Sequence, residues 1–162
     1  MFKFIKHRQL RSSYDDMEGR NEVFYARELG IYTEWYLAMR CEEECYRSKR
    51  YERPVTLLLI EALSEESKGA LYEVGKWVGE WLRPSDLPAR LTGGSYAILL
   101  VETTREQAVM VAERLQESVP PVRVGMSHCP EDGASFDELT AAARTSMSSH
   151  KRVSPSDRLR LR

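Results

Sequence analysis

The sequence has little cysteine, no long apolar run and no excess of charge of one sign. Its 162 residues include only three cysteines, and their formal net charge is −1. No apolar stretch approaches the roughly 20 residues that a membrane-spanning helix requires, and no signal-peptide core follows the basic start. An odd number of cysteines without framework spacing indicates reduced thiols. We therefore expect a cytoplasmic protein, and the balanced charge argues against a nucleic-acid partner.

The cysteines do not form a metal-binding pattern. Cys41 and Cys45 stand one helical turn apart, but a zinc site needs two further ligands. The three histidines, His7, His128 and His150, are far from them in sequence and have no partner spacing. We expect packed or exposed thiols and no metal site.

Charge is nevertheless distributed unevenly along the chain. Residues 1–11 (MFKFIKHRQLR) and 151–162 (KRVSPSDRLRLR) are basic, whereas residues 131–138 (EDGASFDE) are acidic. Basic ends are most often solvated tails. Contact with a membrane surface or a partner is the less favoured alternative.

The order of predicted elements is helix, helix, strand, helix, hairpin, helix, strand, helix. Helices are predicted over residues 15–29, 34–51, 64–82, 105–119 and 136–149. Strands are predicted over residues 55–63, 87–92, 95–101 and 121–129, with a two-residue hairpin turn at Gly93 and Gly94. Two capping boxes, Thr104 with Gln107 and Ser135 with Glu138, begin the last two helices. Strands separated by helices, together with one hairpin, predict an α/β sandwich with a mixed central sheet.

Aromatic side chains are expected to serve packing. On the second predicted helix, Tyr36, Met39 and Tyr46 should pack against the sheet. On the third, Tyr72, Trp77 and Trp81 fit a packing stripe better than a platform for stacking nucleotide bases.

Several stretches are together typical of one known family. They are residues 30–36 (GIYTEWY), 50–61 (RYERPVTLLLIE), 82–90 (LRPSDLPAR), 97–115 (AILLVETTREQAVMVAERL) and 130–143 (PEDGASFDELTAAA). In these stretches the chain resembles a GGDEF domain, the bacterial diguanylate cyclase or nucleotidyl cyclase-like fold. The resemblance implies a domain over residues 30–152. Residues 1–29 would then be a basic start with a signalling-type helix, and residues 153–162 a basic, disordered tail.

The resemblance also implies that the catalytic residues have been lost. The five signature positions read Thr92, Gly93, Gly94, Ser95 and Tyr96, so the acidic positions hold Gly94 and Ser95. Glu61 stands alone at the strand-end metal position, and magnesium requires several oxygen ligands. Residues 61–70 (EALSEESKGA) are too short for the family's guanine-binding segment, although Lys151 matches the lysine that meets the triphosphate. We expect a degenerate domain that is not an enzyme and holds no cofactor.

One ligand site matches the family pattern. Many such cyclases bind their product, cyclic di-GMP, through an Arg-x-x-Asp that ends five residues before the signature. Arg83 and Asp86 stand at that distance, and Arg114 matches the second arginine of the site. The resemblance thus implies a cyclic di-GMP receptor. Alternatively, residues 83–86 simply form a turn, and the two arginines are ordinary surface side chains.

A regulatory domain of this kind also requires a protein partner. A receptor must alter a protein contact, because a ligand shifts an equilibrium only through its differential affinity for two states. We expect a homodimer or another signalling protein. The alternative is a nucleotide-independent dimerisation or protein-interaction scaffold. The heptad pattern of residues 15–29 is weak and leaves dimerisation open.

Overall fold

The computed structural model describes residues 25–26, 31–64, 69–119 and 121–149. Six strands form one sheet in the order β1-β2-β4-β5-β3-β6. The strands are β1 (Tyr25–Ala26), β2 (Ile31–Thr33), β3 (Val55–Ala62), β4 (Leu87–Arg90), β5 (Tyr96–Val101) and β6 (Val122–Cys129). The pair β2 and β4 is parallel and the other pairs are antiparallel. The sheet is therefore mixed, as predicted.

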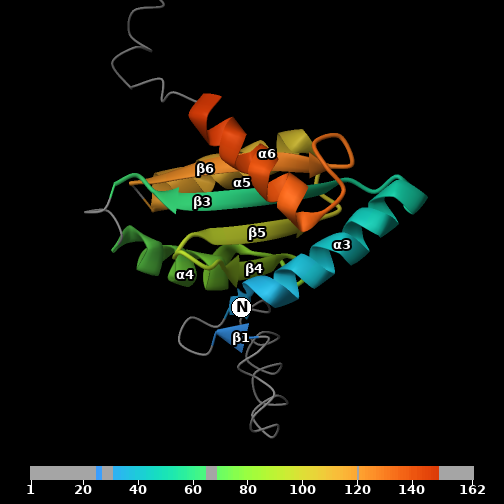
Figure 1. The fold of residues 1–162 in the computed structure, drawn as a ribbon. Helices are drawn as coiled ribbons and strands as arrows, with labels where there is room; N and C mark the ends of the chain where they lie inside the picture. The colour runs from blue at the N-terminus through green and yellow to red at the C-terminus, as the bar shows by residue number, and fades with distance from the viewer. Residues whose placement is uncertain (1–24, 27–30, 65–68, 120, 150–162) are drawn as a thin grey trace, which may run out of the picture.

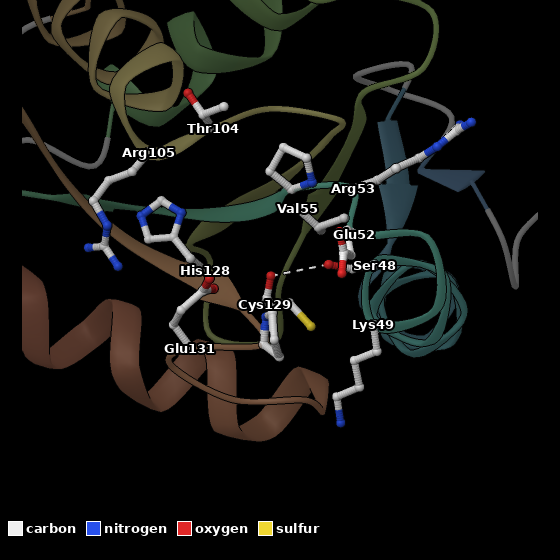
Figure 2. A pocket seen from close by; sticks show the side chains of 12 residues that line it. Ser48, Lys49, Glu52, Arg53, Val55, Thr104, Arg105, His128, Cys129 and Glu131 are labelled. Carbon is white, nitrogen blue, oxygen red and sulfur yellow. Dashed lines mark hydrogen bonds between the residues drawn. The ribbon is translucent and has the colours of Figure 1, made fainter.

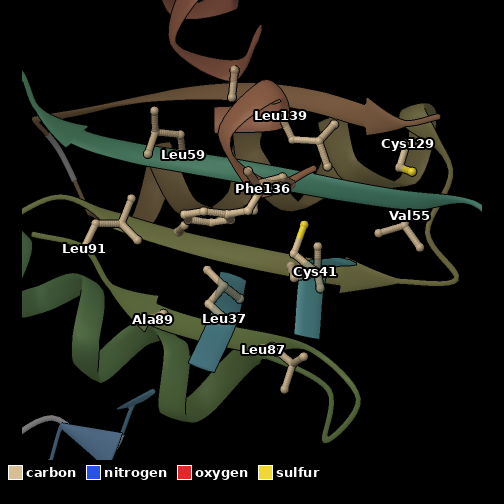
Figure 3. Packing of buried hydrophobic residues seen from close by; sticks show 14 of the residues in the cluster. Leu37, Cys41, Val55, Leu59, Leu87, Ala89, Leu91, Cys129, Phe136 and Leu139 are labelled. Atoms are coloured by element: carbon tan, nitrogen blue, oxygen red, sulfur yellow. The ribbon is translucent and has the colours of Figure 1, made fainter. Parts of the chain in front are cut away.

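Four helices cover the two faces of the sheet (Figure 1). They are α3 (Glu34–Tyr51), α4 (Ala70–Trp81), α5 (Arg105–Ser118) and α6 (Phe136–Ser149). Successive residues of a strand point to opposite faces. Leu57 and Leu59 accordingly pack in one core with α3 and α6, as Figure 3 shows for Leu59. Leu58 and Ile60 pack in a second core with α4 and α5.

The two predicted capping boxes are confirmed. The backbone nitrogen of Gln107 donates to the Thr104 hydroxyl, and the Gln107 side chain accepts from the Thr104 backbone nitrogen. Ser135 and Glu138 make the same reciprocal pair before α6. Each box satisfies backbone donors that a helix start leaves without partners.

The predicted packing face of α3 is wrong in two of its three residues. Met39 and Tyr46 are 37% and 66% exposed, whereas Tyr36 is partly buried against the core. The buried face is instead set by small and aliphatic side chains at helical spacing, namely Leu37, Cys41, Cys45 and Ser48. The three cysteines are buried and form no disulfide, so of the two predicted alternatives, packed or exposed thiols, the structure has packed ones.

The predicted aromatic stripe on α4 is only partly correct. Trp77 is buried, but Tyr72 is 58% exposed and Trp81 is 48% exposed. Trp81 lies about two turns from the buried Val74, so helical spacing alone would place it on the buried side. It is, however, the last residue of α4, and the guanidinium of Arg114 on α5 lies against its ring.

The prediction of a helix over residues 15–29 is wrong at residues 25 and 26. Tyr25 and Ala26 form β1, which pairs with β2. The rest of the predicted helix, the basic start and the basic tail lie outside the described residues. Within the part of the chain that is described, no helix is both long and apolar enough to cross a membrane.

Candidate ligand-binding site

The altered signature forms the turn between β4 and β5. Arg90 opposite Tyr96 is the last strand pair, so residues 91–95 make a five-residue loop instead of the predicted two-residue turn. Gly93 and Gly94 both have φ of +94°, a conformation that favours glycine, and the Leu91 nitrogen donates to the Ser95 carbonyl at 2.8 Å. The Thr92 nitrogen donates to the Glu34 carboxylate at the start of α3 at 2.6 Å. The turn is thus held closed by backbone and side-chain bonds.

Glu61, at the predicted metal position, lies beside this turn. Its neighbour Ile60 pairs with Tyr96, the first residue after the loop. Two guanidinium groups form hydrogen bonds with the Glu61 carboxylate. Arg123 donates to Oε2 at 3.0 Å, and Arg144 donates to Oε1 at 3.2 Å. Both pairs face a cleft of about 530 Å³.

These residues do not fit the magnesium ions of a triphosphate-processing site. Magnesium needs several oxygen ligands, and the acidic positions of the turn hold Gly94 and Ser95, while the Glu34 carboxylate beside the turn already accepts from Thr92. A cation at Glu61 would also meet the positive charges of Arg123 and Arg144. Across the described residues no group of three or more His, Cys, Asp or Glu side chains is arranged for a metal. Lys151 lies outside the described residues.

Arg83 and Asp86 are brought together by a tight turn after α4. The Arg83 nitrogen donates to Oδ2 of Asp86 at 2.9 Å, and the Asp86 nitrogen donates to the Arg83 carbonyl at 3.0 Å. The Asp86 side chain is only 4% exposed, whereas Arg83 is exposed. The aspartate therefore holds the turn, and the arginine projects from it.

Arg114 reaches the same edge from α5. Its guanidinium carbon is 5.1 Å from the centre of the Trp81 ring, and Trp81 precedes Arg83 by two residues. The structure thus places both predicted arginines at the end of α4. Neither side chain forms an ion pair within the described part of the chain. Sequence reasoning assigned Trp81 to the core, because helical spacing fixes the direction of a side chain but not what covers it.

A second cleft, of about 450 Å³, lies at the opposite end of β3 (Figure 2). It contains His128, which sequence reasoning left aside as an isolated histidine. Its Nδ1 lies 2.7 Å from the Thr56 hydroxyl, which also donates to the Thr103 carbonyl. Burial, and next the nearby Arg105, lower the pKa of His128.

Both arginines of this second cleft, whose other cation is Lys49, are already paired. Arg53 donates to Glu102, and Arg105 donates to Asp132 at 3.4 Å. An anionic ligand would have to compete with these carboxylates. Arg83 and Arg114, which form no ion pair with another described residue, are therefore the better candidates for binding an anionic ligand.

The fold is similar to that of solved GGDEF domains and of a solved diguanylate cyclase. The GGDEF domain of DgcB from Caulobacter crescentus, solved in complex with c-di-GMP, has a TM-score of 0.69 and 11% identity, covering 82% of this chain and 89% of that one. The FimX GGDEF domain from Pseudomonas aeruginosa has a TM-score of 0.67 and 16% identity, covering 77% and 91%. The diguanylate cyclase SiaD from P. aeruginosa, solved with its activator SiaC, has a TM-score of 0.65 and 20% identity, covering 88% and 61%. No family model and no curated protein sequence matches the chain.

These comparisons show the fold. The described chain is an α/β sandwich with the mixed sheet and hairpin of a GGDEF domain, as predicted from the sequence. With identities of 11–20% in these three comparisons, the likeness is one of fold.

Proposed function

We propose that this GGDEF-like domain is a catalytically silent receptor for cyclic di-GMP. The observation that carries the proposal is the contact of Arg114 with Trp81, whose ring centre lies 5.1 Å from the guanidinium, two residues before the exposed Arg83. Both arginines are exposed and come from elements separated in sequence by the whole signature hairpin. Support from comparison comes from the DgcB domain, whose structure contains c-di-GMP.

The residue chemistry suits this ligand. Guanidinium forks bind phosphate and the O6 and N7 edge of guanine through paired hydrogen bonds. Asp86 is buried and accepts the Arg83 nitrogen, so we assign it the role of positioning Arg83. Asp86 therefore acts through the turn, and no direct contact with guanine is assigned to it.

Catalytic silence is supported by the altered turn and by Glu61. The acidic signature positions hold Gly94 and Ser95, and the remaining carboxylate is bound to Arg123 and Arg144. We infer that the domain needs no cofactor and that cyclic di-GMP acts only as a regulatory ligand. The free, buried thiols support a reducing compartment such as the cytoplasm.

A receptor also needs a protein contact on which the ligand acts. We propose a homodimer or another signalling protein. Assembly with a partner has a precedent in SiaD, which was solved with its activator SiaC.

The second candidate function is a nucleotide-independent interaction scaffold. It is favoured by exposed apolar side chains on one face of α3: Trp35, Met39 and Tyr46 are 56%, 37% and 66% exposed. Aromatic and methionine side chains are enriched in protein interfaces. On this reading Arg83 and Arg114 are surface groups without a ligand.

Measurement of molar mass with and without cyclic di-GMP separates the two candidates. Arg83→Ala and Arg114→Ala remove the proposed ligand contacts. Arg50→Ala is a matched control, because Arg50 is an exposed arginine 5.4 Å from the centre of the Tyr51 ring on α3. The receptor predicts a ligand-dependent change in assembly that the control retains and the two site variants lose. The scaffold predicts the same assembly in every sample.

A further inference from the structure

The geometry points to Trp81 as a stacking platform for a guanine base of the bound nucleotide, with Arg114 held against it. This inference rests on the proposed cyclic di-GMP site and adds to it a residue that the Arg-x-x-Asp pattern does not contain. Trp81 is 48% exposed although it lies at the end of an amphipathic helix whose other tryptophan, Trp77, is 5% exposed. Its exposure leaves ring surface available two residues before the exposed Arg83.

The contact between Arg114 and Trp81 has a consequence for recognition. A guanidinium over an indole ring is attracted by the negative face of the ring. The distance of 5.1 Å lies within the range of this interaction. Arg114 therefore loses less conformational freedom when a ligand binds, since the ring already restrains it.

Stacking on Trp81 would add selectivity for a base, which the two arginines alone do not provide. Charge-assisted hydrogen bonds from Arg83 and Arg114 attract any phosphate-bearing ligand. A flat aromatic surface beside them adds affinity for a base. Together they favour a purine nucleotide over inorganic phosphate, so Trp81 contributes to the specificity of the site.

Tyr72, on the same helix, is a control for any general effect of removing an exposed aromatic side chain on ligand binding. Tyr72 is 58% exposed and has the Lys76 amino group 5.0 Å from its ring centre. It stands at the other end of α4, nine residues from Trp81, which is about 13 Å along a helix. Its exposure and its cation resemble those of Trp81, but it is remote from the turn of Arg83.

The test is calorimetric titration with cyclic di-GMP combined with tryptophan fluorescence. Trp81→Ala should weaken binding about tenfold or more, Trp81→Phe should stay within about threefold of the unmodified chain, and Tyr72→Ala should change nothing. Cyclic di-GMP should quench fluorescence in the unmodified chain. The quenching should disappear in Trp81→Phe, while that variant still binds by calorimetry. Thermal unfolding of each variant checks that the fold is retained.

Failure of this inference is distinguishable from failure of the receptor proposal. Binding that needs Arg83 but is unchanged in Trp81→Ala overturns the platform and leaves the receptor. The platform is also overturned if Trp81→Ala and Trp81→Phe weaken binding equally and cyclic di-GMP still quenches the fluorescence of Trp81→Phe. A phenyl ring can still stack on a base, so a stacking role requires the phenylalanine variant to bind better than the alanine variant. Absence of cyclic di-GMP binding to the unmodified chain overturns both.

Discussion

The backbone nitrogen of Arg83 donates a hydrogen bond to the buried carboxylate of Asp86, at 2.9 Å. The two residues of the Arg-x-x-Asp pattern therefore have different physical roles. One is an exposed cation, and the other is a buried acceptor that shapes the turn from which the cation projects.

We predict that Asp86→Ala lowers both stability and ligand affinity, whereas Arg83→Ala lowers affinity alone. Loss of a side chain that caps backbone donors costs about 1 kcal/mol. Chemical denaturation of both variants, followed by nucleotide titration, checks this. An Asp86→Ala protein as stable as the unmodified chain would show that the aspartate does not hold the turn.

We predict no dinucleotide product from GTP and Mg²⁺. Magnesium should also leave the melting temperature unchanged, because Arg123 and Arg144 already neutralise Glu61. The measurements are chromatography of the reaction mixture and thermal unfolding across a magnesium series. A linear or cyclic guanine dinucleotide formed only with magnesium would contradict catalytic silence.

Close packing of α6 on β6 gives a prediction for stability. A Cβ atom at Gly125 would lie 2.0 Å from the Ala143 carbonyl oxygen, so Gly125→Ala should cost about 2 kcal/mol or more. Gly69→Ala is the control, since nothing lies within 4 Å of its Cβ position. Equilibrium denaturation of the pair tests the contact, and equal stability of the two variants would refute it.

The buried thiols predict a loss of stability at alkaline pH. Burial, and next the neighbouring Cys45, raise the pKa of Cys129 from 9.0 to about 12. Between these values the unfolded chain releases a proton that the folded chain retains, so the free energy of unfolding falls as pH rises from about 9 to 12. Cys129→Ala should have a shallower decline of melting temperature over this range. If the melting temperature of both proteins declines with the same slope, Cys129 is not the cause of the loss of stability at alkaline pH.

Much of the fold follows from local sequence signals. Thr33 and Pro54 bracket α3, and the helix was predicted at its observed bounds. The capping boxes at Thr104 and Ser135 place the last two helices. The strands β1 and β2 were missed because two and three residues are too short to display a periodicity.

The site was predictable only in part. Residues 83–86 and Arg114 could be recognised from the resemblance to GGDEF domains, and the structure places Arg114 against Trp81, two residues before Arg83. The bonds of Glu61 to Arg123 and Arg144 join residues 62 and 83 positions apart, a proximity that only the sheet and α6 create. The exposure of Trp81 likewise depends on where α4 ends relative to α5, which helical periodicity does not specify.

Isothermal titration of the purified chain with cyclic di-GMP tests the central claim most directly. GTP serves as the ligand control, and Arg83→Ala and Arg50→Ala serve as the site variant and the matched surface variant. The account predicts saturable binding of cyclic di-GMP, retained in Arg50→Ala and lost in Arg83→Ala, with no saturable binding of GTP. No heat with cyclic di-GMP, or binding that persists unchanged in Arg83→Ala, would contradict it.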